Sequence, residues 1–263
     1  MSQEIIQVDA FTAERFRGNP AALCILDEPA DERWMQSLAA EMNLSETAYL
    51  RLDGDAYALR WFTPVAEVDL CGHATVAAAH ILWEDGHVDT AAECRFNTKS
   101  GLLVARRRDG WIEVDFPREE FVEIAAPEGL AEALGTAACR VVENRLSYCL
   151  VEVESEPIVR ELQPDIPALK RLPYNGFVVT SRAQTEELDF VSRFFAPKLG
   201  VDEDPVTGSA HCLLGPYWEG PLGKSAFMAY QASARGGYVR VTVHDDLVCL
   251  GGQAVTVMRG RLV

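Results

Sequence analysis

Most of the chain carries hydrophobic residues with the spacing of β-strands. Short segments alternate polar and apolar positions or concentrate β-branched and aromatic side chains, as half-buried strands do. We therefore predict strands over Ile5–Phe11, Ala21–Leu26, Thr47–Leu52, Tyr57–Phe62, Glu93–Thr98, Leu102–Arg107, Trp111–Phe116, Ala138–Val142, Ser147–Val153, Gly176–Thr180, Leu188–Phe195, Ala226–Gln231, Tyr238–Val243, Leu247–Leu250 and Ala254–Met258.

Two segments have the helical period and one apolar face. The first follows Asp31, a suitable N-cap, and its apolar face is predicted to contain Trp34, Met35, Leu38, Ala39 and Met42. The second is predicted at the surface over Pro164–Leu172.

Two further segments, Gly72–Glu84 and Gly208–Trp218, are apolar nearly all round. A helix with no polar face must be buried on every side, and the surroundings on offer in this chain are strands. The pattern therefore predicts an α+β protein with a curved sheet around one central helix, built once in each half of the chain.

The two halves also match in the residues that lead into these helices. Arg60-Trp61-Phe62-Thr63-Pro64 precedes the first and Arg193-Phe194-Phe195-Ala196-Pro197 precedes the second. Arg60 to Gly72 spans 12 positions and Arg193 to Gly208 spans 15, so the second copy is three residues longer. We interpret the match as an internal duplication that gives two similar domains joined near Pro117–Pro127. The alternative is that strand–turn–helix units simply recur in such proteins.

Charge and composition reduce the number of functions that the protein could have. The 263 residues carry a net charge of −16, which repels phosphate backbones and anionic lipid, so we expect no nucleic-acid and no membrane partner. An anionic substrate must then be held by local donors. The 7 cysteines and 5 histidines lack metal-site or redox-motif spacing, which favours reduced thiols, a cytoplasmic protein and no metal. Phosphate-binding and dinucleotide-binding loops are absent too, so we expect no cofactor.

The starts of the two apolar helices are the strongest candidates for chemistry. Asp69-Leu70-Cys71-Gly72-His73-Ala74-Thr75 opens the first, and Glu203-Asp204-Pro205-Val206-Thr207-Gly208-Ser209-Ala210-His211 opens the second. A helix N-terminus offers unpaired N–H groups to a carboxylate, and glycine lets the ligand approach the backbone. Ordinary capping is the alternative for either helix alone. The occurrence of two matching helix starts favours a ligand site at the junction of the domains.

Three other residues stand out less clearly. His73, beside a helix N-terminus, is predicted to be neutral, either as a ligand-binding group or as a core histidine. Glu46 lies between the end of the first predicted helix and the start of the next predicted strand. It is either a functional residue or an ordinary solvated glutamate of a loop. The presence of Asn19 is sufficiently explained by the preference of turns for asparagine, although its side chain could also bind a ligand.

Six motifs in order now resemble those of the PhzF-like phenazine-biosynthesis isomerase family. They are Gly18-Asn19-Pro20-Ala21-Ala22, Ser45-Glu46-Thr47-Ala48, Arg60-Trp61-Phe62-Thr63-Pro64, Glu67-Val68-Asp69-Leu70-Cys71-Gly72-His73-Ala74-Thr75, the Glu203–His211 segment quoted above, and Gln231-x-Ser233-x-Arg235-Gly236-Gly237. The resemblance implies the diaminopimelate-epimerase fold: two similar domains, 1–117 and 118–263, each a barrel-like, mostly antiparallel sheet around a buried helix. It also implies that the C-terminal strand, 253–263, returns to the first domain, and that the protein is a homodimer.

The same resemblance implies a cofactor-independent isomerase with its site in a cleft between the domains. Glu46 corresponds to the general acid/base, which moves a proton on a small unsaturated or aromatic-like carboxylic or amino acid. The substrate-binding positions are Gly72, His73, Asp204, Gly208 and Ser209. A glutamate in this role is expected to be partly desolvated.

Two alternatives remain open. The wider fold includes epimerases and racemases with one thiol at each helix start, whereas this chain has Cys71 at the first and Thr207 at the second. Inversion of a stereocentre by two thiols is therefore disfavoured. Cys71 and Glu46 could still act together as the two bases of an epimerase or racemase. The other alternative is a non-catalytic protein that binds a small molecule on the same fold.

Overall fold

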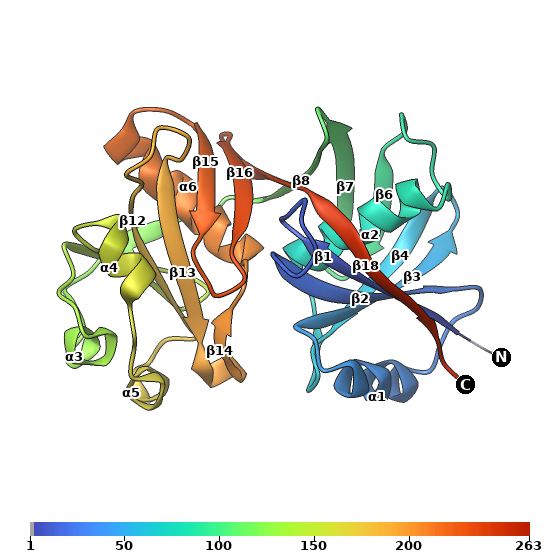
Figure 1. Ribbon diagram of the computed structural model, residues 1–263, viewed down its shortest axis with the longest axis horizontal. Coiled ribbons are helices and arrows are strands. Elements are labelled where there is room, and N and C mark those ends of the chain that lie inside the picture. The colour runs from blue at the N-terminus through green and yellow to red at the C-terminus, as the bar shows by residue number, and fades with distance from the viewer. Residues whose placement is uncertain (1–2) are drawn as a thin grey trace. The chain divides into compact units, whose positions relative to one another are not determined.

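The computed structural model describes residues 3–263, so the first two residues of the first predicted domain lie outside the described residues. The protein is α+β, with much more sheet than helix (Figure 1). Its contacts divide it into two compact units, the first ending at Phe116 and including Cys249–Val263, the second covering Pro117–Val248. No helix among the described residues is long and apolar enough to cross a membrane.

The first unit contains nine strands and two helices. The strands are β1 (Glu4–Ala10), β2 (Asn19–Leu26), β3 (Glu46–Asp53), β4 (Ala56–Phe62), β5 (Glu67–Val68), β6 (Cys94–Thr98), β7 (Gly101–Arg108), β8 (Trp111–Pro117) and β18 (Ala254–Arg261), and the helices are α1 (Glu32–Met42) and α2 (Gly72–Glu84). The C-terminal strand β18 pairs antiparallel with β1.

The second unit contains the strands β9 (Phe121–Glu123), β10 (Arg140–Asn144), β11 (Tyr148–Glu152), β12 (Gly176–Arg182), β13 (Phe190–Ala196), β14 (Val201–Asp204), β15 (Ala226–Gln231) and β16 (Gly237–Val243), while β17 (Leu247–Gly252) runs across the boundary. Its helices are α3 (Leu130–Leu134), α4 (Glu156–Glu161), α5 (Ile166–Arg171), the 3₁₀ turn η1 (Pro197–Leu199) and α6 (Gly208–Leu222).

The same series of strand pairings occurs in each unit. In the first, β1–β2 is antiparallel, β2–β3 parallel, β3–β4 antiparallel, β4–β6 parallel and β6–β7 antiparallel. In the second, β10–β11, β11–β12, β12–β13, β13–β15 and β15–β16 repeat these directions in the same order. In each series the buried helix follows a short strand, β5 or β14, that pairs with the strand before it. This repetition supports the internal duplication.

Both apolar helices are buried as predicted. α2 begins at Gly72 and ends at Glu84, and ten of its 13 residues are buried among strands of the first unit (Figure 1). α6 begins at Gly208 but runs to Leu222, beyond the predicted end at Trp218, with Pro216 and Pro221 inside it. Pro216 has no N–H for the carbonyl of Cys212, and the backbone N–H of Glu119 donates to that oxygen instead (3.3 Å).

The predicted surface helices are confirmed with small differences. Asp31 caps α1 through its carboxylate, which accepts from the N–H groups of Arg33 (2.9 Å) and Trp34 (3.2 Å). Trp34 lies at the border of the buried face, 36% exposed, with its ring against Tyr49. α5 is shorter than its prediction because Asp165 caps it from outside, accepting from Ala168 N–H (2.9 Å). α3 and α4 were not predicted, since five or six residues are too few for a helical period.

Candidate functional site

The first candidate site forms where β2, β3 and α2 all begin. β2 and β3 run parallel with Ala21 opposite Glu46, so Asn19 and Glu46 lie at the same end of adjacent strands. Asn19 reaches that position through a turn at Gly18, whose φ is +62°. A Cβ atom on Gly18 would lie 2.1 Å from the carbonyl oxygen of Ala10, so this turn requires glycine.

His73, in the first turn of α2, connects the polar groups of this site. Its Nε2 lies 3.1 Å from Glu46 Oε2, at ion-pair distance. Its Nδ1 lies 3.3 Å from the side-chain amide of Asn19 and 3.6 Å from Cys71 Sγ. The Glu46 side chain is 17% exposed and that of His73 is 6% exposed. Glu46 is thus partly desolvated, as expected, and contacts the predicted substrate-binding histidine directly.

The charge of His73 differs from the prediction. Burial alone lowers the pKa of His73, but its close contacts with Cys71 and Glu46 outweigh burial and raise that pKa well above its ordinary value. Burial also raises the pKa of the Cys71 thiol to about 11, so this thiol is neutral near pH 7 and Glu46 supplies the charge that favours imidazolium. The direction of this pKa shift runs against the predicted neutral His73, because a helix N-terminus in the sequence does not reveal a carboxylate brought in from another strand.

Glu46, Cys71 and His73 are also the described residues whose donor atoms could hold a metal, since one atom from each lies within 4.8 Å of the others. Their arrangement fits a metal poorly, however. The carboxylate contacts one nitrogen of the imidazole and the thiol contacts the other. A single ion takes only one nitrogen of a ring, so at least one side chain must move before all three could bind it.

The second candidate site forms at the start of α6. Asp204, the last residue of β14, accepts a short hydrogen bond from the Thr207 hydroxyl (2.5 Å). Gln231, at the end of β15, fixes the same turn: its Oε1 accepts from Thr207 N–H (2.9 Å) and its Nε2 donates to the Asp204 carbonyl (2.7 Å). Ser209 lies in the first turn of α6 with its hydroxyl 3.2 Å from that of Tyr148.

Neither helix start is closed by a capping side chain. The N-cap residues, Cys71 of α2 and Thr207 of α6, make no side-chain cap hydrogen bond, and the Thr207 hydroxyl is turned to Asp204 instead. The ordinary-capping alternative therefore fails for Thr207. The first-turn N–H groups at Gly72, His73, Gly208 and Ser209 keep the disposition that suits a carboxylate ligand.

The structure gathers the predicted residues into two groups, each within one unit. Glu46, Gly72 and His73 belong to the first, and Asp204, Gly208 and Ser209 belong to the second. Three polar residues were missed or undervalued. Asn19 had been assigned to its turn, and Tyr148 carried no signal beyond its place in a predicted strand. Gln231 was quoted in a motif but given no role.

Comparisons with known proteins agree with these motifs. A family model described as phenazine biosynthesis-like protein matches residues 8–260. An uncharacterized isomerase of Halalkalibacterium halodurans is 52% identical over 100% of this chain and 99% of its own length. An uncharacterized isomerase of Pseudomonas aeruginosa is 46% identical with the same coverage. A crystal structure of a phenazine biosynthesis protein of the PhzF family from Enterococcus faecalis superimposes with a TM-score of 0.95, at 40% identity and full coverage of both chains.

Proposed function

The chain belongs to the phenazine biosynthesis-like family and is an isomerase, and we propose that it moves a proton on a small unsaturated or aromatic-like carboxylic or amino acid without a cofactor. The observation that carries this proposal is the contact between Glu46 and His73, 3.1 Å apart in a mostly buried site. A proton shift needs one group that is a base in the first half-reaction and an acid in the second, and a carboxylate can be both.

In the proposed mechanism, Glu46 takes a proton from an activated C–H bond of the substrate. The electron pair left behind moves through the conjugated system, and Glu46 returns the proton to a different carbon. No atom is gained or lost, so the step needs no oxidant, reductant or co-substrate. The imidazole ring of His73, 3.1 Å from the Glu46 carboxylate, keeps Glu46 in place for the first transfer.

The helix starts are proposed to bind the substrate. We assign the binding of anionic substrate groups to the first-turn N–H groups of each helix, at Gly72 and His73 in the first unit and at Gly208 and Ser209 in the second, because neither N-cap side chain forms a cap hydrogen bond. Asp204, anchored by the Thr207 hydroxyl, is assigned to an amine or hydroxyl of the substrate. Thr207, Gln231 and Tyr148 position these groups through the hydrogen bonds described above.

The experiment for this proposal is a screen in heavy water. Unsaturated and aromatic amino and hydroxy acids are incubated with the protein, and deuterium incorporation is followed by NMR. We expect at least one compound to exchange at a carbon-bound position and to isomerise. Exchange at a single stereocentre with inversion and no double-bond shift would favour the epimerase alternative. Binding without exchange of any compound would favour the non-catalytic alternative.

A substrate found in this screen also tests the binding assignments. Asp204→Asn should raise KM and lower kcat/KM by about tenfold or more, because it removes a charge assigned to substrate binding. Asp202→Asn is the matched control, because Asp202 lies exposed on the same strand. Equal kinetic effects of the two substitutions would contradict the assignment of Asp204.

A further inference from the structure

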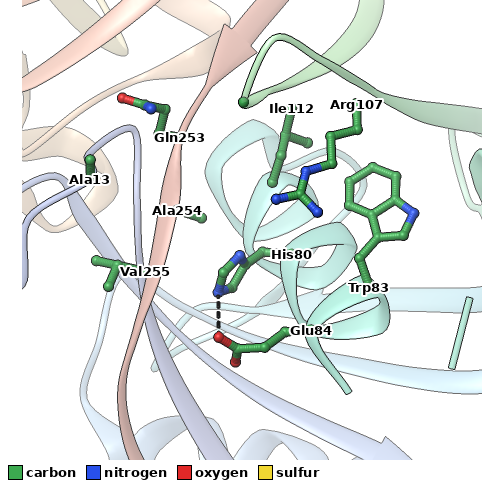
Figure 2. Close-up of a pocket in the computed structure, with 10 residues that line it drawn as sticks. Ala13, His80, Trp83, Glu84, Arg107, Ile112, Gln253, Ala254 and Val255 are labelled. Carbon is green, nitrogen blue, oxygen red and sulfur yellow. Dashed lines mark ion pairs between the residues drawn. The ribbon is translucent and has the colours of Figure 1, made fainter. Parts of the chain in front are cut away.

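A separate cavity lies in the first unit, on the C-terminal half of α2. Its volume is about 270 Å³, and its walls come from α2, β7, the β7–β8 turn, β8 and the start of β18. Figure 2 shows Arg107 of β7 pointing toward His80 of α2, with Trp83 and Ile112 beside them. His80 is seven residues beyond His73, or about 10 Å along the helix axis. The proposed isomerase function uses none of the cavity's side chains.

Arg107 is the cation of this cavity. Within residues 3–263, no ion pair or hydrogen bond to the Arg107 guanidinium is found, whereas its neighbours Arg106 and Arg108 each pair with a carboxylate. A guanidinium presents a planar fork of donors that matches a carboxylate in two hydrogen bonds.

His80 supplies an acceptor on the facing wall. Its Nε2 lies 3.1 Å from the Thr256 hydroxyl and 3.5 Å from Glu84 Oε1. The single hydroxyl proton of Thr256 is donated to Glu84 Oε2 (2.5 Å), so Nε2 must carry the imidazole proton and donate. Burial lowers the pKa of His80, and Arg107 and Arg259 lower it further against the opposing charges of Glu84 and Asp85, so the ring is neutral near pH 7. Nδ1 is then left as an acceptor.

Glu84 also lines the cavity, and its carboxylate already has two donors. Arg259 donates to Glu84 Oε2 (3.0 Å), and the Thr256 hydroxyl donates to the same oxygen. The remaining wall is apolar or backbone, apart from the side chain of Gln253. Trp83, whose indole N–H is donated to Ala92 O (3.0 Å), contributes its ring, and Ile112 and Ala254 contribute alkyl groups. The cavity thus combines the Arg107 cation, the His80 acceptor and an apolar wall with the Glu84 carboxylate, which is already paired, and the amide of Gln253.

We propose that this cavity binds a small carboxylic acid that carries an amino or hydroxyl group beside the carboxylate and a short apolar side chain. The carboxylate binds the Arg107 guanidinium, the amino or hydroxyl group donates to His80 Nδ1, and the side chain lies against Trp83 and Ile112. The volume holds about nine waters, which corresponds to a molecule of amino-acid size. Two sources share this chemistry, the α-amino acids and the α-hydroxy acids.

Four probe compounds of similar shape separate the contribution of the carboxylate to binding from that of the neighbouring amino or hydroxyl group. Leucine has a carboxylate and an ammonium group, leucic acid has a carboxylate and a hydroxyl, isocaproate lacks the neighbouring donor, and isoamylamine lacks the carboxylate. Each is titrated into the full chain and binding is measured by ligand-observed NMR. We expect leucine or leucic acid to bind in the millimolar range, isocaproate about tenfold more weakly, and isoamylamine not at all. A preference between the first two identifies which source the site accepts.

Single substitutions test whether the probes bind in this cavity. Arg107→Met should weaken the best probe at least tenfold, whereas Arg108→Met, the matched control on the same strand, should change its affinity less than twofold. Arg107 is exposed on β7, so its substitution does not disturb the core. Glu46→Gln should leave binding unchanged, which separates this cavity from the proposed catalytic site.

Three results would overturn the proposal. They are no binding of any probe at about ten millimolar, equal binding to wild type and Arg107→Met, or loss of binding in Glu46→Gln. Failure of the isomerase proposal is a different observation, the absence of deuterium exchange in the substrate screen. Either result can occur without the other.

Discussion

His73 is the second residue of α2 and His211 is the fourth residue of α6, and their surroundings shift their pKa values in opposite directions. His73 contacts the Glu46 carboxylate, and its pKa is raised well above the ordinary value. Burial lowers the pKa of His211 to about 4, and its Nδ1 lies 2.8 Å from the carbonyl oxygen of Thr207. A buried histidine follows its nearest charged partner, and only one of the two has such a partner.

We predict that NMR will show this difference directly. In a pH titration of the side-chain nitrogens, His73 should remain protonated at pH values where His211 is neutral. In Glu46→Gln the pKa of His73 should fall, because the substitution removes the neighbouring charge, while that of His211 should not change. An unchanged His73 pKa in this variant would mean that Glu46 is not the group that sustains the imidazolium.

The pKa of His211 also predicts how stability depends on pH. Its folded-state value of about 4 lies below the unfolded value near 6.5, so protonation favours the unfolded chain. The contribution is fully present above the unfolded pKa and is lost as pH falls toward the folded one. Roughly 2 kcal/mol of the free energy of unfolding should be lost between about pH 7.5 and pH 5 through this residue.

Urea unfolding at the two pH values measures that loss in wild type and in His211→Gln. The substituted residue does not titrate, so the variant should lose about 2 kcal/mol less than wild type over the same range. Parallel pH profiles for the two proteins would contradict the assignment of the loss to His211.

At the scale of elements, the two arginine motifs form the same ion pair in each half of the internal duplication. Arg60 of β4 makes a two-bond contact with Glu67 of β5 (2.7 and 2.8 Å), and Arg193 of β13 makes the same contact with Glu203 of β14 (2.7 and 2.9 Å). The three extra residues of the second copy fall between the two partners, where η1 forms. Each pair ties the strand that precedes a buried helix to the short strand that leads into it.

The two pairs should differ in their contribution to stability. The Arg193 side chain is 10% exposed and also donates to the carbonyls of Leu162 (2.6 Å) and Val159 (3.4 Å), whereas that of Arg60 is 32% exposed. Arg193→Met should therefore cost about 3 kcal/mol or more, since it leaves a carboxylate and two carbonyls without their donor. Arg60→Met should cost about 1 kcal/mol or less. Denaturant unfolding compares the variants, and equal losses would refute the distinction.

The elements themselves were largely predictable, and the reason is periodicity. All-round apolarity located α2 and α6 because a helix without a polar face cannot lie at the surface. The contacts of the site were much less predictable. Glu46 and His73 lie 27 positions apart, on a strand and on a helix, and only the parallel pairing of β2 with β3 and the packing of α2 on both bring them together. The contact of Asn19 with His73 and the effect of Glu46 on the pKa of His73 also depend on residues that are distant in the sequence.

At the scale of the whole molecule, the cytoplasmic location and the barrel-like form of each sheet stay predictions, and so does self-association. We predict a homodimer, because the family resemblance implies one and because proteins with many strands usually cover their exposed edges. Sedimentation velocity at micromolar concentration should show a species of twice the chain mass of 29.0 kDa. A monomer alone at that concentration would remove this prediction and leave the chemistry unaffected.

The central claim is that Glu46 transfers the proton, and the solvent-exchange rate of Glu46→Gln tests it most directly. This variant keeps the shape of the side chain but removes the base. With a substrate from the screen, deuterium incorporation should fall by about 10²-fold or more while binding is largely kept. Glu41→Gln, at an exposed position of α1, is the control and should be as active as wild type. Near-normal exchange in Glu46→Gln, together with its loss in Cys71→Ala, would contradict the account and make the thiol the base.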